Sequence, residues 1–252
     1  MQNLLNSLRV LHCKMPYTVC GRGKCHAPSD HSSCEMALFA ATDSWMKSVD
    51  RGSYAGALLV DLSKAFNTVP YQLLLSELRD IRCSTEVLNW FCNYLTDRRQ
   101  RVITHEDITD WIMVSRGFPQ GSGLSPLLFN IFARNLPRQC TSSVFQFADD
   151  TTLTTEDPSL SVVADNLMVS FQAVEKFCDS YDLKINSQKT QLILFKKPGK
   201  PLPDDLPYTG QLHHQIGEDS EVAGYYLGSA SDLRATYRER SQQMSRASRN
   251  IG

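Results

Sequence analysis

The feature that most constrains the fold is a short apolar run that ends on a carboxylate. Residues 57–60 read Ala-Leu-Leu-Val, and Asp61 follows them directly. A run this short, within an apolar stretch over residues 54–62, is typical of a β-strand that is buried on both faces, so other elements must cover it on two sides. A carboxylate beside such a strand is costly to bury unless a cation or a hydrogen-bond donor compensates it.

A second acidic segment lies between two further apolar runs. Residues 144–147 precede the pair Asp149-Asp150, and residues 151–155 continue with β-branched side chains. This pattern predicts a β-hairpin with an acidic turn. Aspartate is common in turns, so an ordinary polar turn is one interpretation. The other is a divalent metal ion shared with Asp61, since Mg²⁺ is typically held by one or two carboxylates together with waters and substrate phosphates.

The remaining sequence predicts a mixture of helices and strands. Apolar residues recur at helical spacing most regularly over residues 158–181. The predicted helices cover residues 33–50, 71–80, 85–95, 124–136 and 158–181, a hairpin covers residues 101–115, and extended segments cover residues 184–186 and 191–195. Residues 197–220 contain four prolines and predict a loop before an apolar run at residues 225–227.

Composition and charge exclude several classes of protein. The 252 residues are 42% apolar and 21% charged, enough for a sizeable core, and the formal net charge is -1. A near-neutral chain does not attract nucleic acid over its whole surface, although it can carry a local basic groove. No apolar stretch approaches the roughly 18 residues of a membrane-spanning helix. No secretory signal is present, so we expect an intracellular protein, in the cytoplasm or nucleus, that binds no membrane.

The cysteines raise a further alternative, a structural zinc site. The chain has eight Cys and no signal peptide, which favours reduced thiols over disulfides. Four of them crowd the first fifth of the chain, and these are Cys13, Cys20, Cys25 and Cys34. Structural zinc sites use two closely spaced ligand pairs, and the nearest pair here has no matching second pair. We therefore expect ordinary thiols in a loop.

A glycine-rich segment over residues 117–123 has two interpretations. It is either an ordinary loop before the helix predicted from residue 124, or a place where a nucleotide or template base approaches the backbone closely. In the second case Gln120 supplies both a donor and an acceptor. The segment lacks the Lys-Ser/Thr ending of a P-loop, so a Walker-type NTPase is unsupported.

Four segments occur in a characteristic order: LLVDLSKAFNTV, SRGFPQGSGLSPLLFNIF, FQFADDTTL and LKINSQKTQLILF. Together they resemble the successive palm motifs of reverse transcriptases of the non-LTR (LINE-type) retrotransposon family. Weaker likeness upstream and downstream of these motifs extends the resemblance to about residues 31–235. The resemblance implies an α+β fold, a right-hand polymerase palm in which helices back an antiparallel sheet. It also implies partial fingers at residues 1–53, a fingers and palm core at residues 54–230, and the start of a truncated thumb at residues 231–252.

The resemblance assigns a metal-binding role to the carboxylates. Asp61 and Asp149 would hold two Mg²⁺ ions, with Mn²⁺ as an alternative metal. Asp150 adjoins them as a third catalytic carboxylate, and the Leu62 carbonyl is a further ligand. In phosphoryl transfer, paired metals stabilise the attacking and the leaving oxygen.

The resemblance also assigns nucleotide-binding residues. Phe66 would lie beneath the incoming sugar and exclude a 2′-hydroxyl, although plain core packing is the alternative. Gln120 and Gly121 match the segment that lies along the nucleotide and template. Lys189 matches a basic residue near the triphosphate, and a solvated surface charge is its alternative.

Some positions depart from the family pattern. Asn67 stands where these proteins usually have Asp, and Gly123 replaces a larger aliphatic residue. The basic stretch that usually clamps the triphosphate is not found, and the segment CGRGKCHAPSD replaces a more familiar Gly-Phe-Arg type segment. Arginines at the end of the chain either bind a nucleic-acid backbone or form a solvated face, and these are Arg234, Arg238, Arg240 and Arg246.

The sequence thus predicts an RNA-directed DNA polymerase that uses an RNA template, a DNA primer and deoxynucleoside triphosphates. It identifies no protein partner. One rival is a noncatalytic nucleic-acid-binding remnant, or an inert fragment, of a decayed element. A metal-dependent phosphohydrolase is a third interpretation, and it explains the carboxylates but not the glycine-rich segment or Phe66.

Overall fold

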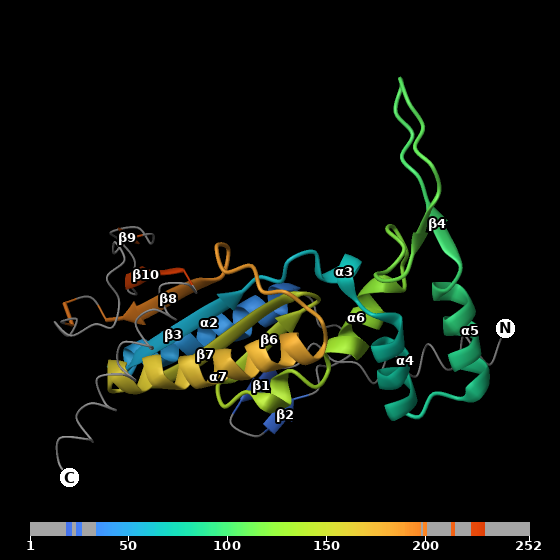
Figure 1. The fold of residues 1–252 in the computed structure, drawn as a ribbon. Helices are drawn as coiled ribbons and strands as arrows, with labels where there is room; N and C mark the ends of the chain where they lie inside the picture. Colours follow the sequence, from blue (N-terminus) through green and yellow to red (C-terminus); the bar gives the residue numbers. More distant parts are fainter. Residues whose placement is uncertain are drawn as a thin grey trace, which may run out of the picture. The chain divides into compact units, whose positions relative to one another are not determined.

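The computed structural model describes residues 19–21, 24–26, 34–197, 199–200, 213–214 and 223–229, and the side chains of residues 40–197 and 199–200 (Figure 1). The chain divides into two compact units that interleave along the sequence. Among the described residues, the helical unit comprises residues 63–135 and 177–184, and the sheet unit comprises the described parts of residues 19–62, 136–176 and 185–229.

The sheet unit contains an eight-stranded sheet in which every pairing is antiparallel. Its strand order is β2-β1-β6-β7-β3-β8-β10-β9. The strands are β1 (Val19–Gly21), β2 (Lys24–His26), β3 (Tyr54–Val60), β6 (Ser143–Phe147), β7 (Asp150–Asp157), β8 (Gln191–Lys196), β9 (His213–His214) and β10 (Ala223–Ser229). The predicted apolar strand is β3, and it lies between β7 and β8.

Helices cover both faces of this central strand (Figure 1). On one face, α2 (Cys34–Asp50) places the Trp45 ring on Phe195, with ring centroids 4.5 Å apart. On the other face, a Cβ at Gly56 would lie 2.6 Å from Val163 of α7 (Leu160–Ser180). Glycine at this position thus allows α7 to approach β3 closely. The predicted double burial of the strand is confirmed.

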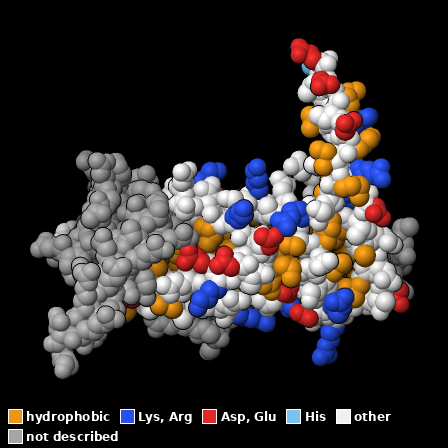
Figure 2. Space-filling view, in the orientation of Figure 1, with side chains coloured by type: hydrophobic (Ala, Val, Ile, Leu, Met, Phe, Trp, Pro, Cys, Tyr) orange, Lys and Arg blue, Asp and Glu red, His pale blue; other side chains and the backbone are white. Residues whose placement is uncertain are grey.

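Among its described residues, the helical unit contains four complete helices and a separate two-stranded sheet. Its helices are α3 (Ala65–Thr68), α4 (Tyr71–Asp80), α5 (Thr85–Leu95) and α6 (Ser125–Ala133). Strands β4 (Arg98–Gln100) and β5 (Ile112–Val114) form a hairpin whose apolar side chains are exposed (Figures 1 and 2). None of the helices in the described part of the chain is long and apolar enough to span a membrane.

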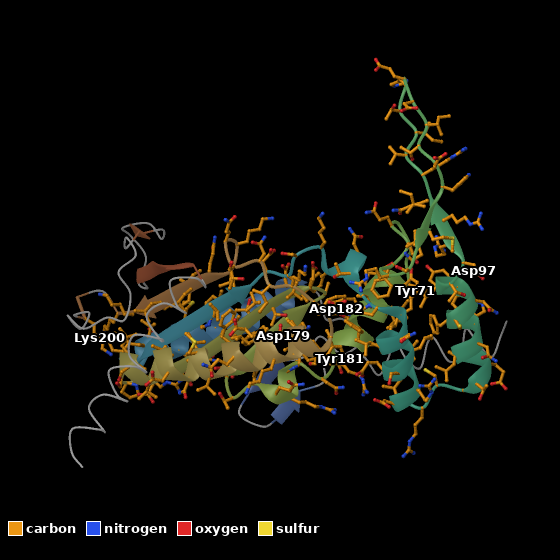
Figure 3. The ribbon with its side chains drawn as sticks, in the orientation of Figure 1. Tyr71, Asp97, Asp179, Tyr181, Asp182 and Lys200 are labelled. Carbon is orange, nitrogen blue, oxygen red and sulfur yellow. The ribbon has the colours of Figure 1, made fainter. Side chains whose placement is uncertain are left out.

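A buried carboxylate ties the helices of this unit together. Glu77 of α4 accepts hydrogen bonds from Arg134 Nε at 2.8 Å, from Asn135 Nδ2 at 3.2 Å and from the Tyr181 hydroxyl. Figure 3 labels Tyr181 and its neighbour Asp182, whose carboxylate pairs with Arg116 at 2.8 Å. Because Glu77 is 6% exposed, these partners replace the water it loses on folding.

Most predicted elements are present, with differences in extent. The loop predicted over residues 197–220 contains β9, and the loop predicted for the N-terminal cysteines is wrong at Cys20 and Cys25, because Cys20 lies on β1 opposite Cys25 on β2. The helix predicted over residues 124–136 ends at Ala133, and a 3-10 turn, η1 (Pro137–Gln139), follows it. The hairpin predicted over residues 101–115 begins earlier, at Arg98. The extended segment at residues 184–186 is a single bridge between Ile185 and Leu62, because the chain turns at Asn186.

A buried thiol in the sheet unit gives a first prediction. Burial raises the pKa of the Cys140 thiol to about 11, and its Sγ lies 3.6 Å from the Leu136 carbonyl oxygen. Cysteine reacts as the thiolate, so we expect iodoacetamide at pH 8 to leave Cys140 unmodified in the folded chain and to label it in urea. The raised pKa also makes stability depend on pH. Below about pH 9 the Cys140 thiol is protonated in both states and costs no free energy of unfolding. As the pH rises towards 11 the free energy of unfolding falls, because only the unfolded state then ionises. Peptide mass mapping checks the labelling, and equal rates in both states would contradict the assignment.

Candidate active site

Three acidic residues lie at one end of two neighbouring strands in the sheet unit. The register of β3 with β7 ends at the pair Val60 and Thr151, so Asp61 and Asp150 are the next residues on these two strands. Asp149 precedes Asp150 in the tight turn between β6 and β7. Strand pairing therefore brings together carboxylates that are far apart in the sequence.

The electrostatics of Asp149 reflect this crowding. Burial raises the pKa of the Asp149 carboxyl, and the negative charges of Asp150 and Asp61 raise it further. A backbone hydrogen bond acts in the opposite direction. Asp149 thus lies close enough to Asp150 and Asp61 to be repelled by both, and a bound cation would relieve this repulsion.

The backbone of Asp61 is held by the turn that precedes β8. Its N–H donates to Thr190 Oγ1 at 3.2 Å, and its carbonyl accepts from the Asn186 N–H at 2.9 Å. The Thr190 hydroxyl in turn donates to the Asn186 carbonyl at 2.9 Å. Sequence analysis missed Thr190 and Asn186 as positioning residues, although both lie in the fourth motif and flank Lys189.

Leu62 and Lys189 lie beside the same turn. Leu62 is buried and forms an antiparallel bridge with Ile185. The neighbouring Asn186 N–H donates to the Asp61 carbonyl and not to the Leu62 carbonyl. Lys189 is exposed, and its N–H donates to the Asn186 carbonyl at 3.2 Å. The structure therefore places Lys189 on the turn that fixes Asp61.

Phe66 belongs to the helical unit and is half-buried in an aromatic cluster. Its ring stacks on Phe129 with centroids 4.9 Å apart and meets the edge of Phe118 at 6.0 Å. Its carbonyl accepts the Phe118 N–H at 2.8 Å. Part of the ring thus contributes to the core of this unit, and the rest remains accessible.

The glycine-rich segment is attached to α3. The Gly117 N–H donates to the Val69 carbonyl at 2.9 Å, and a Cβ at Gly117 would lie 2.5 Å from the Asn67 carbonyl oxygen. Gly117 and Gly121 both have positive φ, of 81° and 76°. Gln120 and Gly121 are exposed, and the space around Gly121 is open. The segment therefore leads into α6 and also presents an accessible backbone, so both interpretations of it stand.

The oxygen donors beside Asp61 fit a magnesium ion chemically. Among the described residues there is no preformed group of three or more His, Cys, Asp or Glu side chains around one metal position. Mg²⁺ needs no such group, because one or two carboxylates hold it together with waters and substrate phosphates. The structure brings Asp61, Asp149 and Asp150 together in the sheet unit and places Phe66 and the glycine-rich segment in the helical unit. The terminal arginines and Cys13 lie outside the described residues.

Comparison with known proteins agrees with the motif resemblance. Residues 6–230 match the family described as reverse transcriptase (RNA-dependent DNA polymerase). A probable RNA-directed DNA polymerase from transposon BS of Drosophila melanogaster is 26% identical over 218 residues, which cover 82% of this chain and 23% of that protein. The polymerase from mobile element jockey of the same species is 23% identical over 202 residues, covering 76% and 21%. The chain thus spans about a quarter of the length of these relatives.

Two solved structures show the same fold. Telomerase from Candida albicans, in complex with a TWJ fragment of telomeric RNA, is 15% identical, with a TM-score of 0.51 over 79% of this chain and 34% of that chain. Apo telomerase from Candida tropicalis is 16% identical, with a TM-score of 0.51 over 77% and 39%. With the family match over most of its length, the chain belongs to the reverse transcriptase (RNA-dependent DNA polymerase) family, as a domain of the non-LTR (LINE-type) retrotransposon kind.

Proposed function

We propose that this chain is the polymerase domain of a retrotransposon reverse transcriptase, which extends a DNA primer with deoxynucleotides along an RNA template. The observation that carries the proposal is the convergence of Asp61, Asp149 and Asp150 at adjoining strand ends in a member of this family. The relatives named as RNA-directed DNA polymerases support it.

Two Mg²⁺ ions, with Mn²⁺ as an alternative, are the proposed cofactors. Asp61 and Asp149 would bind them, with Asp150 and the Leu62 carbonyl as further oxygen ligands. When bound, such ions lower the pKa of a primer 3′-hydroxyl and neutralise the charge of the triphosphate and of departing pyrophosphate. The repulsion that raises the pKa of Asp149 supports this assignment, because it is relieved by positive charge.

The chain's own residues position the reacting groups. The Asp61 carbonyl accepts a hydrogen bond from the Asn186 N–H, and the Asp61 N–H donates to the Thr190 hydroxyl. These two bonds fix the backbone of Asp61 and thereby limit the positions that its carboxylate can take. The Lys189 ammonium, on the same turn, would neutralise or protonate the leaving pyrophosphate. Gln120 and Gly121 would line the path of the template and the nucleotide.

A right-hand architecture accompanies this function. Residues 54–230 would form the fingers and palm core, with the sheet unit from β3 onward as the palm, and the antiparallel sheet with helices and the likeness to telomerase support this assignment. Residues 1–53 would contribute partial fingers, and residues 231–252 would begin the thumb. The arginines in this last segment would bind template or primer phosphates, and salt would weaken that binding.

Phe66 gives a prediction about sugar selection. We expect Phe66→Val to incorporate ribonucleotides at least about tenfold better relative to deoxynucleotides, because a smaller side chain leaves room for a 2′-hydroxyl. The measurement is the ratio of kcat/KM for dTTP and UTP. Phe118→Leu is the matched control, since it alters the same aromatic cluster without touching the sugar. An unchanged ratio in an active Phe66→Val protein assigns Phe66 to core packing alone.

Primer extension on a homopolymeric RNA template, paired with filter binding of the same duplex, tests the proposed function. We expect a DNA primer to grow in the presence of Mg²⁺ and deoxynucleotides. Binding without extension would identify a noncatalytic nucleic-acid-binding domain. Neither binding nor extension by the folded chain would identify an inert fragment.

A further inference from the structure

The β4–β5 hairpin extends away from the helices of its own unit (Figure 1). Residues 98–114, which we call the arm, pair through Arg98 with Val114 and through Gln100 with Ile112. A further bridge joins Ile103 to Ile108 near the tip. Among the described strands, none pairs with β4 or β5 except each other. A two-stranded hairpin of this kind is only marginally stable alone in water.

Apolar side chains are exposed along the length of the arm, from Met113 opposite Arg99 to Ile103 and Ile108 near the tip. Six of its large apolar side chains are more than half exposed, and these are Val102, Ile103, Ile108, Trp111, Ile112 and Met113. Figure 2 shows them as a band along the arm. Contiguous exposed apolar surface marks an interaction site, and Trp and Met are enriched in the cores of protein interfaces.

The charges of the arm are segregated along its length. Arg99 and Arg101 lie towards its base, and the Arg101 guanidinium lies 4.6 Å from the centroid of the Trp111 ring. The exposed tip carries acidic side chains instead (Figure 2), and these are Glu106 and Asp107, whereas Asp110 adjoins Trp111 and lies further down the arm. Because side chains alternate across a strand, Arg99 shares a face with Arg101 and with its cross-strand partner Met113.

We propose that the arm binds the arm of a second copy of this chain, antiparallel and around a two-fold axis. In this arrangement the acidic tip of each arm meets Arg99 and Arg101 of the other arm, and the apolar side chains along the two arms cover one another. A two-fold interface requires a surface that is complementary to itself, and arginines near one end, carboxylates at the other end and apolar side chains along the arm meet this requirement. A nucleic acid fits less well, because its phosphates would meet the carboxylates of the tip.

The dimer is expected to be reversible. The arm is shorter than the roughly 20–30 residues that each partner contributes to a standard interface. Its charged ends add selectivity and salt dependence more than affinity. The proposal therefore predicts a monomer–dimer equilibrium with a dissociation constant in the micromolar range, on the order of 1–100 μM.

Sedimentation equilibrium with charge-reversed variants tests the proposal. Glu106→Lys with Asp107→Lys reverses the tip, and Arg99→Glu with Arg101→Glu reverses the base. We expect each variant alone to dimerise at least about tenfold more weakly than the unmodified chain. An equimolar mixture of the two should regain the dimer, because every contact then joins opposite charges. This recovery also shows that both variant arms are folded.

A second pair of substitutions tests the exposed apolar side chains of the arm without changing its charge. Trp111→Ser with Met113→Ser should weaken dimerisation at least about tenfold at every salt concentration. A monomeric unmodified chain up to about 200 μM, or a mixture that stays monomeric, would overturn the proposal. If the same variants weaken RNA binding in a filter assay but leave the molecular mass from sedimentation equilibrium unchanged, the arm is a nucleic-acid-binding element and not a dimer interface.

Discussion

Asp149→Asn is expected to abolish primer extension while the chain stays folded. The carboxylate lies with Asp61 and Asp150 where two strands end, and the proposed metals need its negative charge. Removal of one preorganised electrostatic contact from an active site costs roughly 100–1,000-fold in kcat. We therefore expect at least a 100-fold loss in the rate of single-nucleotide addition.

The stability of this variant should not fall. Burial and neighbouring carboxylates raise the pKa of Asp149, so the ionised form is disfavoured in the metal-free fold. Asn removes that charge, and we expect an equal or higher midpoint of thermal unfolding in the absence of Mg²⁺. Asp157→Asn is the matched control, because it makes the same change at the opposite end of β7. Extension by folded Asp149→Asn at the rate of Asp157→Asn would contradict the metal assignment.

Gly117→Ala is expected to have the largest effect on stability. Gly117 has a φ of 81°, and left-handed backbone costs an L-residue roughly 1–2 kcal/mol. A Cβ would also lie 2.5 Å from the Asn67 carbonyl oxygen, which is backbone and cannot rotate away. Such overpacking adds roughly 1–3 kcal/mol. We expect the midpoint of thermal unfolding, measured by circular dichroism, to fall by roughly 5–15 °C.

Gly121→Ala separates steric collision from backbone strain. Gly121 has a similar φ of 76°, but a Cβ there would meet nothing within 4 Å. We therefore expect this variant to lose only about 1 kcal/mol, or a few degrees. Equal midpoints for the two variants would show that the attachment of the glycine-rich segment to α3 is absent in solution.

Elements with local signals could be predicted from the sequence. Helix α5 begins after Ser84, whose hydroxyl accepts the Val87 N–H, and α4 begins directly after Pro70. Strand β3 was predictable because it is short, apolar and buried on both faces. The acidic turn before β7 was predictable from the β-branched residues that follow it.

Features that depend on distant residues were not predictable. Thr190 accepts a hydrogen bond from Asp61 across 129 positions, and Tyr181 donates to Glu77 across 104 positions. The spacing of apolar residues along the sequence does not predict such contacts, because they form only when distant elements pack together. The hairpin of the arm was predicted but its exposure was not, since a short apolar run such as residues 111–114 usually indicates a buried strand.

Single-nucleotide addition on an RNA template of defined sequence tests the central claim most directly. A DNA primer annealed so that the next template base is uridine is incubated with Mg²⁺ and one deoxynucleotide at a time. The account predicts that dATP alone extends the primer, and that the same mixture without divalent metal gives no product. Addition of all four deoxynucleotides at equal rates, or no addition by a folded chain that binds the duplex, would contradict it.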